Sequence, residues 1–473
     1  MLGAGNRGFD VYGRHALGGA GLRFQAVADS DPVKLERFGA AHSIPAAARF
    51  SDWREAVIFA QTQRLEAAFV CLPDALHEDA AIACLEADLH VMLEKPAANT
   101  LAGTRRVLRA MDASSRVVML GYVLRFTPFF QTLRRVIESG ALGRIVTMDW
   151  RENVSSMHYA HSYVRGNWRN TCESSPMILA KCSHDLDLLG WLTSSAVTRA
   201  SSFGCLQHFK LENAPEGAPQ RCLEGCPVSE TCAFYAPKVY LTDNAGWPAS
   251  VISADSSINA RKHALETGPY GRCVYHCDND VVDHQVAILE LTGGASATFA
   301  MHGHSGEEGR TLRIDGTLAT LRGVFSATKQ ELRLERHDVD TAFSGASELI
   351  PIEVMTGVTG AGHGGGDAGL TRAFVKAVQN NARADPAQYL ESHLLAFALE
   401  DSRLHGGRVV DLAEFRNAKP SGRLTSMQLA YMLFADKELT PCRAAPPKPN
   451  SSFYAITTPT SSRTPASAWT WRC

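Results

Sequence analysis

The chain has 473 residues, enough for two or three domains. Hydrophobic residues make up 45% of it and charged residues 20%, so the composition supports a large core and excludes a chain that is disordered throughout. The 47 Lys and Arg residues are balanced by 49 Asp and Glu residues, a formal charge of −2, and this balance argues against nucleic acid as the main partner.

No membrane span or secretory signal is expected. The longest apolar runs, such as 67–72, are far shorter than the roughly 20 residues of a membrane-spanning helix. The first residues, Met1-Leu2-Gly3, lack the charged and apolar regions of a signal peptide. We therefore expect a cytoplasmic protein whose 12 cysteines are reduced, so that clustered cysteines bind metal or simply pack.

Residues 1–121 alternate short apolar runs with amphipathic segments. Strands that alternate with helices indicate a parallel sheet with helices on both faces, and we expect an N-terminal Rossmann dinucleotide-binding domain here. The predicted strands are 24–29, 66–72, 90–94 and 116–120, and the predicted helices are 33–42, 76–87 and 101–113.

Residues 122–415 are expected to form an α+β domain with an open, mainly antiparallel sheet; the family resemblance described below implies that this domain serves substrate binding and oligomerisation. Alternating polar and apolar residues predict this sheet. A cysteine-rich insertion interrupts the domain near 220–280. Residues 416–473 are expected to be a disordered tail, because 440–473 are rich in Pro, Ser, Thr and Ala and show no sustained period. The predicted helices are 128–139, 176–192, 368–379 and 389–404, and the predicted strands are 144–153, 285–291, 295–302, 311–314, 318–321 and 331–336.

A glycine motif opens the chain: Gly3, Gly5 and Gly8 fit G-x-G-x-x-G, with Asn6 and Arg7 between the last two. The first glycine makes a tight turn, the second lets the backbone approach a pyrophosphate, and the third permits close packing of a helix on a strand. The pyrophosphate would lie at the N-terminus of that helix.

Asp29 ends the predicted strand 24–29 and follows Gly8 by 21 residues. A carboxylate at this point can accept hydrogen bonds from both ribose hydroxyls and would repel a 2′-phosphate, so NAD is expected rather than NADP. An N-capping Asp before Pro32 is the plainer alternative. Only Met1 and Leu2 precede Gly3, so we expect an incomplete central strand and a natural start further upstream.

Glu94-Lys95-Pro96 ends the predicted strand 90–94. Lys95 should therefore lie at the carboxyl edge of the sheet, where open α/β folds bind their ligands. The following proline ends the strand and favours an extended backbone at Lys95. An ordinary solvated lysine is the alternative for this position on its own.

The order of four motifs along the chain favours a ligand-binding Lys95 over a solvated one. They are the glycine motif, Cys71-Leu72-Pro73-Asp74 followed by His77, Glu94-Lys95-Pro96, and residues 121–126. Over residues 1–415 the series resembles the Gfo/Idh/MocA family, which includes glucose–fructose oxidoreductase and inositol dehydrogenase. The resemblance implies a Rossmann domain joined to an α/β domain, bound NAD(P), a carbohydrate-like substrate and a homo-oligomer. It also implies that Lys95 lies near the nicotinamide and the substrate hydroxyl, with further cofactor contacts at Leu72, Pro73, His77 and Glu94.

A second catalytic element is Lys181, His184 and Asp187, which share a broad face of the predicted helix 176–192. Polar groups on so apolar a helix are costly unless they are paired or line a cleft, although a hydrogen-bonded core histidine is the alternative. The family pattern Asp-x-x-x-His-x-x-Asp implies that His184 is the acid/base. Ala180 replaces the leading aspartate, and Lys181 is expected to substitute for it in substrate binding beside Asp187.

Two further segments are candidates for binding a polyhydroxylated ligand. The polar aromatic loop 152–169 offers Tyr159, Arg165 and Trp168, and the glycine-rich block that precedes Asp367 offers His363. A packed lid without sugar contacts is the alternative for the loop, and a flexible connector is the alternative for the glycines.

The cysteine-rich insertion holds Cys222, Cys226 and Cys232 within 11 residues, and Cys273 follows later. Four such thiols can bind a tetrahedral structural zinc. The spacing is not that of a standard zinc ribbon, so an iron–sulfur cluster or free thiols remain as alternatives.

The function expected is that of an NAD-dependent oxidoreductase, which transfers a hydride between nicotinamide and a hydroxyl-bearing carbon of a sugar, polyol or sugar derivative. Lys95 and His184 would manage the hydroxyl proton. The alternatives are a redox-neutral NAD-dependent glycosidase and a non-catalytic NAD(P)-sensing regulator. The presence of both Lys95 and His184 argues against the regulator.

Overall fold

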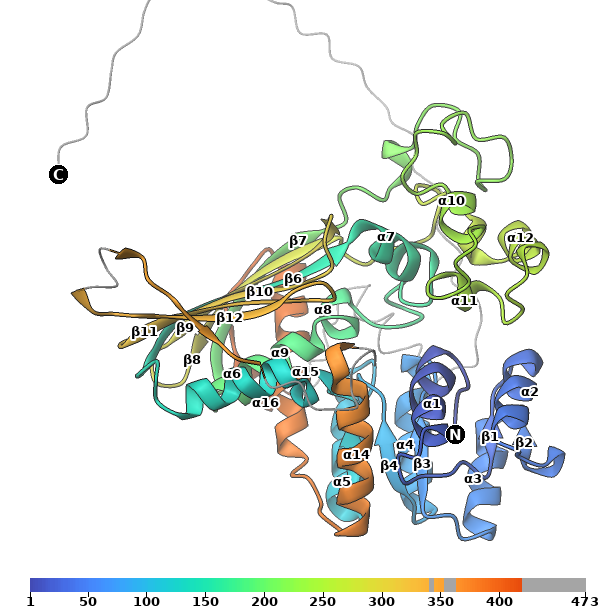
Figure 1. The fold of residues 1–473 in the computed structure, drawn as a ribbon, viewed down its shortest axis with the longest axis horizontal. Coiled ribbons are helices and arrows are strands. Elements are labelled where there is room, and N and C mark those ends of the chain that lie inside the picture. Colours follow the sequence, from blue (N-terminus) through green and yellow to red (C-terminus); the bar gives the residue numbers. More distant parts are fainter. Residues whose placement is uncertain (340–343, 353–362, 419–473) are drawn as a thin grey trace, which may run out of the picture. The chain divides into compact units, whose positions relative to one another are not determined.

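The computed structural model describes residues 1–339, 344–352 and 363–418, which lie in one compact unit, Met1–Lys419 (Figure 1). Within these residues, no helix combines the length and the apolar character needed to cross a membrane. The predicted tail from 416 lies almost entirely outside the described residues; its first two residues, Arg416 and Asn417, end helix α16 (Leu412–Asn417).

The N-terminal half is a Rossmann fold. Leu2 forms parallel bridges to Ala28 and Val70 and so joins a two-stranded and a three-stranded parallel sheet. With Leu2 in the middle, the order β2-β1-Leu2-β3-β4-β5 is the 3-2-1-4-5-6 order of dinucleotide-binding domains. The strands are β1 (Val27–Ala28), β2 (Arg49–Phe50), β3 (Ala67–Val70), β4 (His90–Leu93) and β5 (Val118–Leu120).

Helices cover this sheet, and their bounds agree well with the sequence prediction. Helix α5 has the predicted bounds, Leu101–Ala113, because Thr100 caps its first turn and an amphipathic period runs through it. Helix α3 (Trp53–Thr62) was not predicted. The other helices here are η1 (Asn6–Gly13, π-helical), α1 (Arg14–Leu17), α2 (Pro32–Ala41), η2 (Ala46–Ala48), η3 (Asp74–Leu76) and α4 (His77–Glu86).

The second half is built on an open nine-stranded sheet, as the sequence predicts. Its order is β13-β12-β11-β10-β6-β9-β8-β7-β14, and only the pair β6–β9 is parallel. Seven of the strands are β6 (Ile145–Ser155), β7 (Val197–Cys205), β8 (His284–Leu291), β9 (Ser296–Ser305), β10 (Gly309–Gly316), β11 (Ala319–Ser326) and β12 (Gln330–Arg336), and the two edges are β13 (Glu348–Ile350) and β14 (Val410–Asp411).

One face of this sheet is buried and the other is open. Helices α6 (Pro128–Glu138), α9 (Ser183–Thr193) and α15 (Ala387–Leu404) lie along one face, where β6 buries Met148 and Trp150 (Figure 1). The opposite face exposes apolar side chains, among them Phe203 and Ile288. Helix α14 (Gly366–Gln379), whose first residues contact η4 (Val123–Phe126), stands beside the Rossmann half.

The predicted helix 176–192 is wrong as a single helix. The structure divides it into α8 (Met177–Ala180) and α9, with Lys181 and Cys182 at the break. Pro176 precedes α8, and no amphipathic repeat distinguishes a continuous helix from two short ones in so apolar a stretch.

The cysteine-rich insertion between β7 and β8 consists of turns and short helices. It has its own small cluster of buried residues, which includes Ala236, Tyr240 and Leu265. The helices are η6 (Leu211–Asn213), α10 (Ala236–Tyr240), α11 (Ala249–Ile252), α12 (Ile258–Thr267) and η7 (Pro269–Gly271).

The glycine turn that opens the chain has little room for side chains. Gly3 has a φ of +89°, and a Cβ there would lie 2.4 Å from the carbonyl oxygen of Cys71. A Cβ on Gly8 would lie 2.0 Å from the carbonyl oxygen of Gly3, whereas a Cβ on Gly5 would meet no atom within 4 Å. Gly3 and Gly8 are therefore packing requirements, and Gly5 is not.

We predict that Gly8→Ala lowers the free energy of unfolding by about 1–3 kcal/mol, the usual cost of overpacking a closed site. Gly5→Ala is the matched control and should leave it almost unchanged, since Gly5 has an extended backbone and open space around it. Urea unfolding of both variants followed by circular dichroism measures the difference. Equal unfolding midpoints would contradict this account of the turn.

Candidate functional site

Arg7 ties the glycine turn to two distant motifs. Its Nε donates to Glu94 at 2.7 Å, and its Nη1 donates to Asp367 at 2.7 Å. Glu94 is buried and also accepts a hydrogen bond from the Tyr12 hydroxyl at 2.6 Å. Burial alone would raise the pKa of Glu94, but the charge of Arg7, the hydrogen bonds from Tyr12 and Arg7 and the charge of Lys95 together lower it. The glycine turn, the end of β4 and the start of α14 thus meet at one ion-paired cluster.

Asp367 extends this cluster to His363. The Asp367 carboxylate, almost completely buried, lies 3.0 Å from His363 Nδ1. Burial opposes ionisation of Asp367, yet the nearby Arg7 and His363 lower its pKa. The His363 ring centroid lies 6.4 Å from that of His184, so the predicted substrate residue and the predicted acid/base are neighbours.

Lys95 lies two residues after the end of β4, at the carboxyl edge of the parallel sheet. Its Nζ donates to the backbone carbonyl of Ala180 at 2.6 Å, which is available because α8 ends there. Burial lowers the pKa of Lys95, and the charges of Asp74 and Glu94 oppose this effect. The hydrogen bond brings Lys95 to the segment that carries His184.

His184 lies in the first turn of α9 and is 8% exposed. Its Nδ1 is buried and has no hydrogen-bond partner among the described residues. Burial, and then the positive charge of Lys95, hold the pKa of His184 well below its ordinary value of 6.5. A neutral imidazole with a free buried nitrogen can accept a proton or a hydrogen bond from a ligand.

A buried ionic network lies beneath His184. Asp185 accepts hydrogen bonds from Trp150 Nε1 at 2.8 Å and from Arg310 Nε at 2.7 Å. Arg310 also pairs with Glu152 at 2.7 Å, and Glu152 lies 3.1 Å from Lys181 Nζ. The network therefore fixes the start of α9 on strands β6 and β10.

Lys181 and Asp187 are both held in ion pairs. Lys181 Nζ lies 3.4 Å from Glu308, whose carboxylate also lies 2.8 Å from His158 Nδ1. Burial would lower the pKa of Lys181, but Glu152 raises it, so the ammonium stays charged. Asp187 forms a two-pronged pair with Arg125 at 2.7 and 2.5 Å. Lys181 and Asp187 are therefore already ion-paired, and a ligand that binds either side chain would do so alongside the existing partner.

The aromatic loop is attached to the Rossmann half through Asp74. Trp168 Nε1 donates to Asp74 at 3.2 Å, and the hydroxyls of Ser174 and Ser175 donate to the same carboxylate. The Trp168 side chain is partly exposed. The loop therefore reaches the carboxyl edge of the parallel sheet.

Tyr159 and Arg165 have surroundings that do not support their predicted role in substrate binding. Tyr159 is fully buried, and its hydroxyl donates to the carbonyls of Val281 and Val282. Arg165 is 1% exposed and turns towards the cysteine-rich insertion, where it donates to backbone carbonyls. In this structure both side chains hold the loop in place.

His77 bridges two loops of the Rossmann half. Its Nδ1 lies 2.6 Å from the carbonyl oxygen of Pro96, and its Nε2 lies 2.7 Å from that of Leu72. Leu72 and Pro73 follow β3, so this ring joins the segments after β3 and β4. The family resemblance predicts that His77 contacts the cofactor. In this structure its ring lies between the carbonyl oxygens of Leu72 and Pro96 and links the two segments.

The turn and its surroundings fit a dinucleotide. Open space adjoins Gly5, and η1 begins at Asn6, so a pyrophosphate could approach the backbone at the start of that helix. Asp29 accepts the Ala4 and Asp31 amides at 2.7 and 2.9 Å, and its carboxylate keeps further lone pairs for a ribose.

Three charged residues of the candidate site were not predicted from the sequence: Glu152, Arg310 and Glu308. For the first two a signal existed, since the two-residue period of a strand places Glu152 on the face of Trp150 and Arg310 on the face of Leu312. A charge on the buried face of a strand needs a partner and indicates an ionic cluster. No comparable pattern distinguishes Glu308.

Among curated relatives, an inositol 2-dehydrogenase of Saccharopolyspora erythraea is 28% identical over 203 residues, which are 43% of this chain and 55% of that protein. Another from the same organism is 29% identical over 219 residues, 46% of this chain and 59% of that protein. The chain thus spans about half the length of the curated relatives it matches.

Solved structures share the fold at low identity. A levoglucosan dehydrogenase in complex with NADH and levoglucosan matches with a TM-score of 0.62 and 17% identity, over 87% of this chain and 98% of that one. An aldose-aldose oxidoreductase from Caulobacter crescentus, complexed with glycerol, matches with a TM-score of 0.61 and 15% identity, over the same shares.

Two family profiles follow one another along the chain. The profile described as the oxidoreductase family with an NAD-binding Rossmann fold matches residues 1–122, and that of the GFO/IDH/MocA C-terminal domain matches residues 130–215. Both halves of the architecture and the motifs at the junction agree with these matches. These matches place residues 1–122 and 130–215 in the Gfo/Idh/MocA oxidoreductase family.

Proposed function

We propose that this protein is an NAD-dependent oxidoreductase that transfers a hydride between nicotinamide and a hydroxyl-bearing carbon of a sugar, polyol or sugar derivative. The observation that carries the proposal is the pairing of Lys95 with the start of the His184 segment, through the carbonyl of Ala180. This pairing places a cation and a buried neutral imidazole together at the carboxyl edge of a dinucleotide-binding sheet.

The relatives support the substrate class. Curated relatives are named inositol 2-dehydrogenases, and similar structures hold levoglucosan or glycerol. The polyhydroxylated ligand would lie beside His184 and His363, whose rings are neighbours, with the free Nδ1 of His184 as a hydrogen-bond acceptor. Lys181 and Trp168 are the further candidates for contacts with it.

The nicotinamide, when bound, supplies the hydride acceptor or donor. In the oxidation direction His184 takes the proton of the substrate hydroxyl, because its lowered pKa keeps the ring unprotonated at neutral pH. Lys95 donates a hydrogen bond to the same oxygen and stabilises the developing alkoxide. The glycine turn, with Asp29 and Glu94 behind it, would hold and orient the dinucleotide.

The activity is tested by mixing the purified protein with NAD⁺ and, separately, myo-inositol, levoglucosan and glucose, and following NADH by its absorbance. Formation of NADH that depends on one of these compounds supports the proposal. Cleavage of a glycoside panel without net NADH formation would favour the redox-neutral glycosidase instead. Bound NAD with neither activity would favour a regulator.

We predict that Lys95→Ala and His184→Ala each reduce turnover by about 10²–10⁴-fold, the usual contribution of a positioned acid/base group. NAD affinity should change little in either variant. Lys262→Ala and His263→Ala, which alter exposed neighbours on α12, are the matched controls. Single-turnover NADH formation measures the effect, and near-normal rates in both site variants would place the chemistry elsewhere.

The pH profile of kcat/KM should be bell-shaped. Because the pKa of His184 lies well below 6.5, the base stays available down to lower pH, and the acid limb should fall below 6.5. Because the pKa of Lys95 lies below 10.5, this side chain loses its positive charge at a lower pH than an ordinary lysine does. The midpoint of the alkaline limb should therefore lie below pH 10.5. An acid limb above 6.5 would contradict the role of His184.

NAD should bind more tightly than NADP, because Asp29 meets a 2′-phosphate with like charge. Asp29→Asn keeps an acceptor for the Ala4 amide and removes the charge, so the ratio of the two dissociation constants should fall by about tenfold or more. Asp31→Asn, two residues on, is the control. Titration followed by protein fluorescence measures both constants, and equal affinities in the native protein would refute the assignment.

A further inference from the structure

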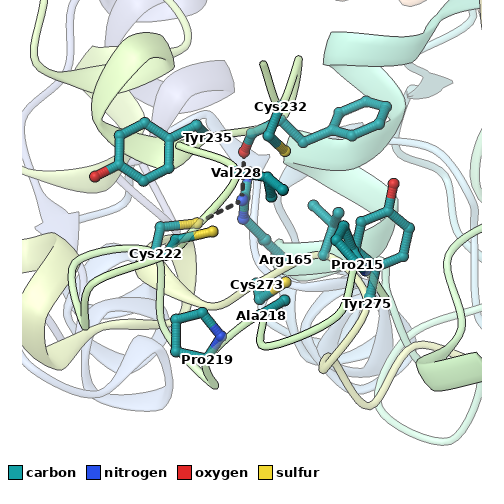
Figure 2. Close-up of a pocket in the computed structure, with 13 residues that line it drawn as sticks. Arg165, Pro215, Ala218, Pro219, Cys222, Val228, Cys232, Tyr235, Cys273 and Tyr275 are labelled. Atoms are coloured by element: carbon teal, nitrogen blue, oxygen red, sulfur yellow. Dashed lines mark hydrogen bonds between the residues drawn. The ribbon is translucent and has the colours of Figure 1, made fainter. Parts of the chain in front are cut away.

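Four cysteines from two separate stretches line one small cavity in the cysteine-rich insertion (Figure 2). Cys222, Cys226 and Cys232 come from the first stretch and Cys273 from the second, and all four are free thiols. Two backbone hydrogen bonds join the stretches: Cys222 N to Gly271 O and Cys273 N to Gln220 O, both 2.9 Å. The chain therefore brings these thiols together by antiparallel pairing of its backbone.

Arg165 enters the same cavity from η5 (Ala160–Arg165) and is 1% exposed (Figure 2). Its Nε donates to Arg272 O at 2.7 Å, and its Nη2 donates to Phe234 O at 2.7 Å and to Cys222 Sγ at 3.6 Å. These partners are two neutral carbonyls and a thiol, and the Tyr240 hydroxyl also forms a hydrogen bond with Arg165. No carboxylate in the described parts of the chain forms an ion pair with Arg165. A buried guanidinium without a counter-charge is costly, so a negative charge is needed beside it.

We propose that Cys222, Cys226, Cys232 and Cys273 bind one structural zinc ion and that Arg165 is the counter-charge of the resulting tetrathiolate site. Binding Zn²⁺ by four thiols releases four protons and leaves a site with a formal charge of −2 beside the guanidinium. The same thiolates that zinc requires thus supply the charge that Arg165 lacks.

In the described residues, no group of three or more His, Cys, Asp or Glu side chains is arranged to hold a metal ion as it stands. Zinc binding therefore requires the four Sγ atoms to move towards a common point in the cavity that they line. A structural zinc ion would stabilise the surrounding segment, whose own buried cluster is small and consists of Cys222, Ala236, Tyr240 and Leu265.

The zinc would also set the position of the aromatic loop. Arg165 lies three residues before Trp168, and Trp247 of the insertion packs edge-on against His158 and His161, at 5.1 and 5.4 Å between ring centroids. The role proposed for the metal is structural, so this inference does not depend on the redox activity proposed above.

The test is metal analysis by inductively coupled plasma mass spectrometry of the full-length protein, produced with added zinc and purified without chelators. About one zinc per chain is expected. Cys226→Ser should lose most of it, and Cys205→Ser, which alters an exposed cysteine outside the cavity, should retain it. Protein that is folded without metal, or that holds iron with visible absorbance, would overturn the proposal.

Thiol counting on the native protein keeps the test decisive if Cys226→Ser does not fold. A chromogenic disulfide reagent should react with four more thiols after a chelator has removed zinc. Arg165→Met should weaken zinc retention against a chelating dye by about tenfold or more, and Arg199→Met, a surface control, should not. No change in thiol reactivity would overturn the zinc site, and unchanged retention in Arg165→Met would overturn the role of Arg165.

Discussion

The double ion pair of Arg7 is the interaction on which the rest of the site depends. One guanidinium joins Glu94, which is 87 residues away in the chain, and Asp367, which is 360 residues away. Both carboxylates are buried, so each would be costly without the cation. The pair therefore places the glycine turn, Lys95 and His363 relative to one another. Loss of Arg7 would leave the buried carboxylates of Glu94 and Asp367 without their common cation. It would also remove the link between the glycine turn and the segments of Lys95 and His363.

The break between α8 and α9 has a chemical consequence. Where the family pattern has an aspartate, this chain has Ala180, whose backbone carbonyl accepts the Lys95 hydrogen bond. A carbonyl holds the ammonium in place but, unlike a carboxylate, brings no full negative charge to raise its pKa. Burial can then lower the pKa of Lys95 against the more distant charges of Asp74 and Glu94. The substitution thus changes the electrostatics of the lysine while the backbone keeps its position.

The sequence predicted features that depend on local patterns. Helix α5 begins at a Thr cap and has an amphipathic period, so its bounds were predicted correctly, and the alternation along β8 and β9 predicted the antiparallel sheet. The break after Ala180 was not predicted, because the stretch is apolar on every side and gives no periodic signal. The surroundings of Arg165 could not be predicted either, since they depend on pairing between segments more than 50 residues apart.

The aromatic loop connects the candidate active site with the cysteine-lined cavity of the insertion. At one end Arg165 lies among the thiols of the insertion, and three residues later Trp168 donates to Asp74 at the edge of the parallel sheet. Asp74 in turn contributes to the field around Lys95. The insertion thus holds one end of a loop whose other end lies beside Asp74, near the proposed catalytic residue Lys95. Because loops on a rigid support carry specificity in many enzymes, the aromatic loop, held by the insertion through Arg165, is suited to carry the specificity of the function proposed above.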